Sequence, residues 1–172
     1  IPTMLTHQRL ENGTYSILNE HTLNDTFEVA RLYGDAQPNR FDLNGWATNA
    51  FISGGGGQDT LLVTSNTDMT LRNATLLERI FFSLLYDFDK DASLSLPTDA
   101  TYHLSSLEKV TLTGGAGDNV IDASGYTRPV TFAGLGGNDT LIGGSAGDTF
   151  VFDGDDVLGT DTVTGNGGTD LL

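Results

Sequence analysis

Residues 134–151 read GLGGNDTLIGGSAGDTFV, two consecutive nine-residue units in which a glycine cluster leads to Asp, Thr and two apolar residues. Each unit fits the pattern G-G-x-G-x-D-x-U-x, where U is a large apolar residue, with one glycine replaced. Glycine clusters allow tight turns, and short β-branched or aromatic runs between them predict strands. A helix would need ten or more periodic residues. The stretch therefore predicts three- or four-residue strands alternating with glycine turns.

Further copies of this unit occur on both sides of it. The best one is 54–62 (GGGGQDTLL), which fits at every position. Three others are eroded: 114–122 (GGAGDNVID) has Asn119 in the place of Asp, 156–164 (DVLGTDTVT) is a degenerate copy that keeps Asp161, and 165–172 (GNGGTDLL) stops before its ninth residue.

A longer repeat contains these units. Residues 27–63 align without a gap on residues 107–143, with identities such as Gly54/Gly134 and Asp59/Asp139, and the match fades near Leu71. Self-similarity at a fixed period is typical of stacked repeat architectures. We divide the chain accordingly into an N-terminal edge segment (1–26), a first 80-residue unit (27–106) and a truncated second unit (107–172).

The spacing of the apolar segments predicts the fold. They recur every nine or ten residues, so two strands and two turns make a coil of ~18–20 residues with alternate side chains pointing inward. We predict an all-β, right-handed parallel β-roll or β-helix, a solenoid. The segment 73–106 departs from this rhythm and is predicted to be an irregular insert. Within it, Thr75–Tyr86 is compatible with an amphipathic helix or a long strand.

Composition limits the partners. The chain has 172 residues, 23 Asp and Glu against 8 Lys and Arg, a net charge of −15, 22 glycines and no cysteine. Nucleic acid and anionic membranes need a basic surface, so neither is expected to bind. The longest apolar run, Ile80–Tyr86, is too short to span a bilayer. Cations can neutralise such an acidic chain. We also expect a fragment of a longer protein, since it begins Ile1-Pro2 without Met.

The repeated turn has the chemistry of a calcium site. Calcium takes six to eight oxygens and accepts backbone carbonyls beside carboxylates. Left-handed glycine angles can gather carbonyls, and the Asp adds charge. One turn offers half a shell, so the ion must be shared between stacked turns. We expect two stacks, Asn119–Asp139–Asp161 and Asp148–Asp170, with Asn39 and Asp59 repeating the 20-residue step. Asp59 has a less obvious partner, because Asp68 lies in a half-turn without glycine.

The predicted calcium ligands are residues of these turns, through carbonyl or side-chain oxygens. They are Gly54, Gly56, Asp59, Gly115, Gly117, Asn119, Gly134, Gly136, Asp139, Gly143, Ser145, Asp148, Asp161, Gly165, Gly167 and Asp170.

These tandem units resemble the repeats-in-toxin (RTX), or hemolysin-type calcium-binding, family. The resemblance is strong over 114–172 and moderate over 34–71. It extends to repeat segments of very large bacterial surface and secreted proteins. It implies calcium-induced folding outside the cell, often after type I export. We therefore expect a calcium-binding structural module of a secreted or cell-surface, adhesin-like bacterial protein.

Other functions have weaker support in the sequence. The sequence supplies no nucleophile or acid–base pair, so we expect no enzyme activity; 143–147 matches G-x-S-x-G, but a strand follows instead of the helix that a nucleophile elbow needs. The alternative is an accessory calcium-binding module of a secreted carbohydrate-active enzyme or peptidase. A polysaccharide-binding surface at Tyr33, Trp46 and Tyr126 and contacts between copies of the chain are further candidates, although core or stacking roles are favoured for Trp46 and Tyr126 over ligand binding. Residues 87–98 begin like an EF-hand loop, but Ala92 and Thr98 replace its glycine and glutamate.

Overall fold

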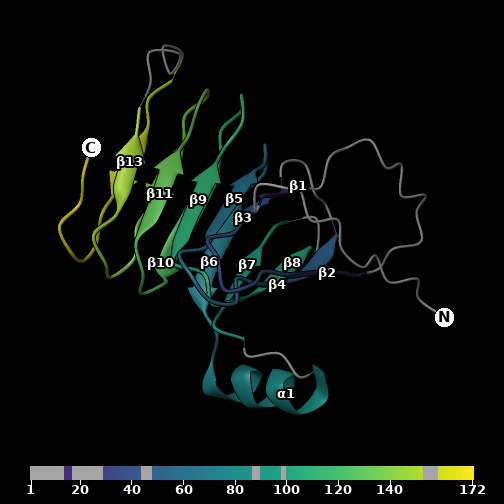
Figure 1. Cartoon of the computed structure of the whole chain (residues 1–172). Helices are drawn as coiled ribbons and strands as arrows, with labels where there is room; N and C mark the ends of the chain where they lie inside the picture. The colour runs from purple at the N-terminus through teal and green to yellow at the C-terminus, as the bar shows by residue number, and fades with distance from the viewer. Residues whose placement is uncertain (1–13, 17–28, 44–47, 87–89, 98–99, 153–158) are drawn as a thin grey trace.

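The structure is a computed structural model that describes residues 14–16, 29–43, 48–86, 90–97, 100–152 and 159–172. These residues form strands β1 to β14 and one helix, α1 (Figure 1). The strands belong to two sheets, and every pairing is parallel except the two that one strand of the second sheet makes with its neighbours. The prediction of an all-β chain with parallel sheets is therefore confirmed at this level. The N-terminal segment 1–26 lies outside the described residues except for 14–16.

Sheet A is parallel throughout. Its strands, in spatial order, are β1 (Thr14–Ser16), β3 (Arg40–Asp42), β5 (Thr60–Thr64), β9 (Lys109–Thr113), β11 (Val130–Ala133) and β13 (Thr149–Val151).

Sheet B holds the other eight strands. In spatial order they are β14 (Thr162–Thr164), β12 (Thr140–Ile142), β10 (Val120–Gly125), β6 (Met69–Asn73), β7 (Ala92–Ser95), β8 (Thr101–Ser105), β4 (Asn49–Ser53) and β2 (Val29–Tyr33). Strand β7 is antiparallel to both of its neighbours, β6 and β8.

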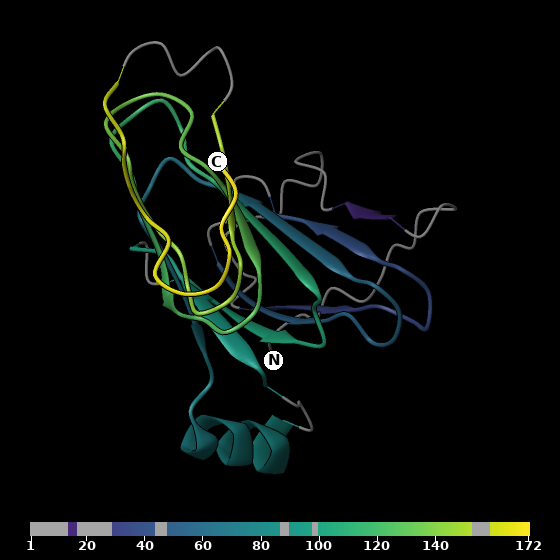
Figure 2. The same cartoon turned by 90° about the vertical axis from the view of Figure 1, so that its left-hand side faces the viewer.

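The register of the pairs matches the predicted repeat length. Thr131 lies beside Thr149 in sheet A, and Thr140 lies beside both Val120 and Thr162 in sheet B. Outside the insert, consecutive strands alternate between the sheets. From β2 onward a strand there pairs with one that follows 18 to 22 residues later, whereas β1 pairs with β3 at a longer step, Thr14 beside Arg40. In Figure 2 the segments from β9 onward follow nearly the same path, one in front of another.

The core lies between the two sheets. Burial alternates along the strands, as in β5, where Leu61 and Val63 are buried and their neighbours are not. Residues at the same register stack on each other, and the rings of Phe132 and Phe150 lie parallel with centroids 4.9 Å apart. This period-2 pattern is why such short strands suffice: each contributes one or two apolar side chains to a continuous core.

The segment 73–106 is largely regular structure, which corrects its description as an irregular insert. It contains α1 (Leu76–Tyr86), β7 and β8. The ambiguity at Thr75–Tyr86 is resolved in favour of the helix. Thr75 and Glu78 form a capping box: Thr75 Oγ1 accepts the Glu78 N–H, and Glu78 Oε2 accepts the Thr75 N–H at 2.9 Å.

The two 80-residue copies occupy opposite sheets. Strands β3 and β5 lie in sheet A, whereas their sequence equivalents β10 and β12 lie in sheet B. The chain changes sheet five times between a strand and its equivalent, and five is an odd number. Duplicated residues such as Asp59 and Asp139 therefore stand on different faces of the molecule.

Candidate metal-binding turns

In sheet B, the acidic side chains of the predicted turns link each turn to the one before it. Asp139 Oδ1 accepts the backbone N–H of Asn119 at 2.7 Å, and Asp161 Oδ1 accepts that of Asp139 at 2.8 Å. The predicted stack Asn119–Asp139–Asp161 is thus confirmed as a geometrical arrangement. We call this row, with Asp68, ladder B.

A second row, ladder A, runs along sheet A. Asp170 Oδ1 accepts the N–H of Asp148 at 2.9 Å, which confirms the stacking of that pair. Asp59 Oδ1 accepts the N–H of Asn39 at 2.8 Å, which confirms the 20-residue step. Because Asn39 and Asp59 precede β3 and β5, they belong to the same sheet as Asp148 and Asp170.

The same side chains also close their own turns. Asp148 Oδ2 accepts the N–H of Gly144 at 2.7 Å, four residues earlier, while its Oδ1 accepts the N–H of Val130 at 2.8 Å. Asn119 Oδ1 likewise accepts the N–H of Gly115 at 2.7 Å. The side-chain amide oxygen of Asn119 suffices for this hydrogen bond within the turn, whereas the two oxygens of the Asp148 carboxylate accept N–H groups from two different turns.

Two ladder members were missed as partners from the sequence. Glu108 Oε2 accepts the N–H of Asp59 at 2.8 Å and continues ladder A across the insert. Asp68 Oδ1 accepts the N–H of Val120 at 2.8 Å and begins ladder B. Each acid directly precedes a strand, Glu108 before β9 and Asp68 before β6. That position, rather than the glycines, is the sequence signal that would have found them.

The first glycine of each unit lies under the acid five residues later. A Cβ at Gly134 would collide with the Asp139 carboxylate, and one at Gly54 with both Asp59 and the Ser106 carbonyl. Gly143 and Gly165 are placed in the same way beneath Asp148 and Asp170. A side chain at these positions would therefore displace the ladder.

The remaining predicted ligands face the neighbouring turn. The third-position glycines Gly56, Gly136 and Gly167 lie against the backbone of the stacked turn. Ser145 donates its N–H to the Tyr126 carbonyl at 3.1 Å. In the eroded unit, Gly115 and Gly117 contact the side chain of Asn66.

Left-handed backbone occurs at the second and fourth positions of three turns. Leu135 and Gly137 have φ values of 71° and 107°, and Asn166 and Gly168 follow the same pattern at 63° and 93°. Gly55 and Gly57 make the third case. The expectation of left-handed turn geometry is confirmed for these three turns, even where the second residue is not glycine, but the described turns at 114–119 and 143–148 have no residue with positive φ.

The Asp59 carboxylate is buried, close to other carboxylates and only partly hydrogen-bonded. Its side chain is fully buried, and its Oδ2 has no hydrogen-bond partner among the described residues. Burial raises the pKa of Asp59, the Asn39 amide lowers it, and the nearby carboxylates of Glu108 and Asp35 raise it further. Asp148 differs, because a backbone amide occupies each of its oxygens.

The donor set fits calcium in kind. Carboxylate oxygens and backbone carbonyls meet at these turns, as at Gly54, where the Ser106 carbonyl and the Asp59 carboxylate both lie where a Cβ would stand. Within the described part of the chain, no three His, Cys, Asp or Glu side chains are grouped so that they could hold a metal. A calcium ion at these turns would therefore depend on carbonyl oxygens for much of its shell.

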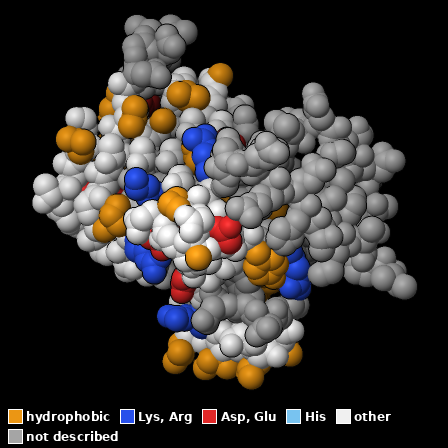
Figure 3. Space-filling model, viewed as in Figure 1, with side chains coloured by type: hydrophobic (Ala, Val, Ile, Leu, Met, Phe, Trp, Pro, Cys, Tyr) orange, Lys and Arg blue, Asp and Glu red, His pale blue; other side chains and the backbone are white. Residues whose placement is uncertain are grey.

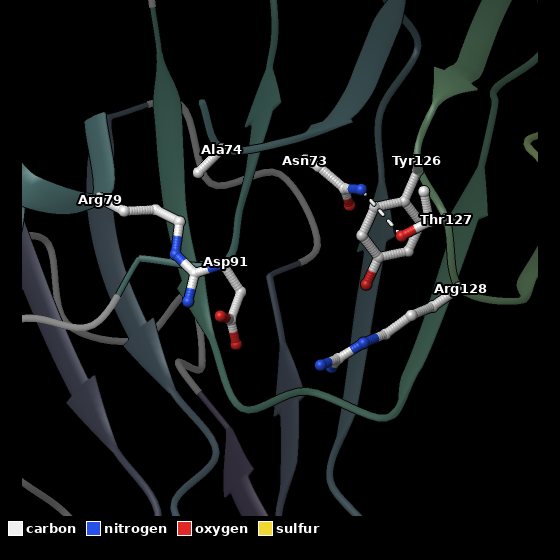
Figure 4. A pocket seen from close by; sticks show the side chains of 7 residues that line it. All are labelled: Asn73, Ala74, Arg79, Asp91, Tyr126, Thr127 and Arg128. Atoms are coloured by element: carbon white, nitrogen blue, oxygen red, sulfur yellow. Dashed lines mark hydrogen bonds between the residues drawn. The ribbon is translucent and has the colours of Figure 1, made fainter. Parts of the chain in front are cut away.

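A small polar pocket opens beside the insert (Figure 4). It has a volume of about 190 Å³ and is lined by Asn73, Ala74, Arg79, Asp91, Tyr126, Thr127 and Arg128. Arg128 Nη1 donates to the Leu107 carbonyl at 2.8 Å, and Asp91 Oδ2 accepts the Ser106 N–H at 3.0 Å. Tyr126 lines the pocket but is only 5% exposed, so little of its ring is open to a ligand.

This burial corrects one hypothesis and supports another. Tyr126 cannot serve as a stacking platform for a sugar ring; it belongs to the hydrophobic core, as its repeat position predicted. Trp46 and most of the acidic run at 87–91 lie outside the described residues. The described residues contain no helix that is both long and apolar enough to cross a membrane.

Compared with family models, with curated proteins and with solved structures, the chain shows no significant match.

Proposed function

We propose that this chain is a calcium-stabilised structural module, a right-handed parallel β-roll or β-helix, from a large secreted or cell-surface protein of the RTX type. Its role is to form an extended, adhesin-like scaffold and to carry no catalysis. The support is the stacking of acidic turns in two ladders, one along each sheet. A chain with a net charge of −15 that stacks its carboxylates in rows gains stability from bound cations.

The observation that carries the calcium proposal is Asp59. A buried carboxylate oxygen without a partner is costly, and a divalent cation would satisfy it. The negative charges of Glu108 and Asp35, which interact electrostatically with Asp59, would add to the attraction for the cation. We therefore propose the turn 54–59 as the first calcium site. Asp139, Asp148, Asp161 and Asp170 remain proposed ligands, with Asp148 the one whose carboxylate is most fully used by amides.

Calcium would act through folding. In a calcium-poor cytosol the rows of carboxylates repel each other, and outside the cell the ion binds and stabilises the stacked turns. At 10 mM calcium and a Kd of ~10⁻⁴–10⁻³ M, one site contributes about 1.4–2.7 kcal/mol. For a chain of this size that corresponds to a rise in melting temperature of roughly 3–10 °C.

The test is a thermal melt with excess chelator and with 10 mM calcium, for the wild type and for Asp59→Asn. We expect calcium to raise the wild-type melting temperature and Asp59→Asn to lose a large part of that rise. Asp118→Asn, at an exposed turn position, is the matched control and should keep it. Identical β-structure and melting temperature with and without calcium would refute the calcium proposal.

A second candidate function rests on the polar pocket. Arg79, Asp91, Tyr126 and Arg128 line the pocket, a set of donors and acceptors suited to a sugar hydroxyl or carboxylate. The volume of about 190 Å³ would admit no more than one saccharide unit. A glycan array with wild type and Arg128→Ala would test it: binding that the variant retains, or no binding at all, excludes this site.

A further inference from the structure

Helix α1 exposes an unusually large apolar face. Six of its residues are large and apolar with side chains on the surface: Leu76 (74% exposed), Leu77 (77%), Ile80 (49%), Phe81 (47%), Leu84 (78%) and Leu85 (62%). Figure 3 shows hydrophobic side chains along the lower edge of the molecule, where Figure 1 places α1. We call these six residues the α1 face.

The opposite side of the helix fixes it to the body. Glu78 pairs with Arg72 at 2.8 Å and with the buried Lys90 at 3.0 Å. The centroid of the Phe82 ring lies 4.4 Å from the centroid of the His103 ring and 5.8 Å from that of the Phe51 ring. Because these anchors determine which side faces the sheets, the α1 face is held outward by the fold itself.

The size of the α1 face matches one half of an interface. At roughly 150–200 Å² for a fully exposed large apolar side chain, it presents about 600–750 Å². The largest apolar patch on a typical monomer is ~300–600 Å², and a standard interface buries about 800 Å² per partner. A surface of this size on so short a helix is expected to be covered.

The pattern of the face identifies a second copy as the occupant. Leu76, Ile80 and Leu84 form one i±4 ridge, and Leu77, Phe81 and Leu85 form a second ridge beside it. Two helices whose i±4 ridges interdigitate pack in the commonest arrangement of globular proteins, crossing at about −50°. The groove between two such ridges accepts a ridge of the same kind, so the face is complementary to itself.

Charge also permits this pairing. The Glu78 carboxylate, the one acid on the helix, is neutralised by Arg72 and Lys90 on the body side. The α1 face therefore adds no repulsion of its own, although each copy carries −15 overall. We propose that the chain dimerises through α1, two copies packing their α1 faces against each other about a two-fold axis.

The first test is sedimentation velocity over a range of protein concentrations. We expect a monomer–dimer equilibrium in the micromolar range, as interfaces near the lower size limit give. Salt should strengthen it, since screening reduces the repulsion between two acidic bodies. Leu77→Gln with Leu84→Gln should weaken it at least tenfold. Leu172→Gln, at an equally exposed leucine elsewhere, is the control and should change nothing.

The second test uses the absence of cysteine. Ile80→Cys, near the middle of α1, should form a disulfide-linked dimer under mild oxidation, and Leu172→Cys should not exceed background. A chain that stays monomeric at all concentrations and salt levels, or cross-links equally at both positions, overturns the proposal. So does a monomer that instead binds neutral lipid vesicles through Leu77 and Leu84, because a membrane would then be the occupant.

Discussion

Removing the Asp148 carboxylate should destabilise the protein even when no metal is present. This side chain is 1% exposed and accepts the N–H of Val130 at 2.8 Å and the N–H of Gly144 at 2.7 Å. A hydrogen bond to a charged group contributes about 1.5–3 kcal/mol. Asp148→Ala loses two of them and buries two unpaired amides, so we expect a loss of about 3–6 kcal/mol. Asp148→Asn retains one acceptor oxygen and should lose about half as much.

The assay is urea unfolding in excess chelator, followed by circular dichroism, together with hydrogen exchange at the Val130 and Gly144 amides. Both amides should exchange faster in Asp148→Ala than in the wild type. Asp118→Ala is the control, since Asp118 Oδ1 accepts the Asn138 N–H at 2.7 Å but on the exposed surface, and it should cost less than about 1 kcal/mol. If Asp148→Ala destabilises the chain only when calcium is present, the carboxylate acts through metal and not through the ladder.

Three further predictions concern the turns and the insert. Gly137→Ala should cost about 2–4 kcal/mol, because it places a side chain at φ 107° against the backbone of Gly117. The control Gly136→Ala places its Cβ at ordinary contact distances and should cost about 1 kcal/mol or less, and thermal melts of both variants check the difference. Burial and, to a lesser extent, the charge of Lys90 lower the pKa of His103 to about 4. The unfolded chain therefore binds a proton at a higher pH than the folded chain does, and the free energy of unfolding should fall as the pH drops from 6.5 to 4. His103→Phe should remove about 2–3 kcal/mol of that fall, measured by urea titrations at each pH. Glu78→Gln leaves the Lys90 ammonium buried without its carboxylate and should cost about 3 kcal/mol, with a weaker helix signal at 222 nm. The Arg72 hydrogen bond lowers the pKa of Glu78, so the stabilisation by this carboxylate is complete above pH 4.5. As the pH falls below that value, the stability of the wild type should approach that of the variant. An equal pH dependence for His103→Phe and wild type, or no loss in Glu78→Gln, would contradict the respective assignments.

The regular part of the chain could be predicted because its information is local. A nine-residue unit defines a strand, a turn and the acid between them, so the strands at 120–142 and the stacks of Asp139 and Asp148 follow from spacing alone. Ladder A could not be completed in the same way. Asp59 reaches Glu108 across 49 residues, because the insert separates turns that are adjacent in space.

The insert resisted prediction for a different reason. Leu76–Tyr86 is apolar at most of its positions, so the sequence is compatible with a helix or a long strand, and the capping box of Thr75 and Glu78 is the signal that distinguishes them. The 80-residue alignment also misleads about position. Asp59 and Asp139 are equivalent in sequence but precede strands of different sheets, because sequence identity carries no record of how many times the chain changes sheet between them.

The hydrogen bonds of the two ladders mostly run in one direction, so a substitution affects the two neighbouring turns unequally. In most rungs the acid of a later turn accepts the amide of an earlier one, as Asp170 does for Asp148 and Asp161 for Asp139. A substitution that removes such an acid therefore leaves a backbone N–H of the preceding turn, on the N-terminal side, without its acceptor, while the turn that follows is affected less directly. Loosening would spread backward along the chain, so that Asp170, near one end of its row, protects residues that lie 22 positions upstream.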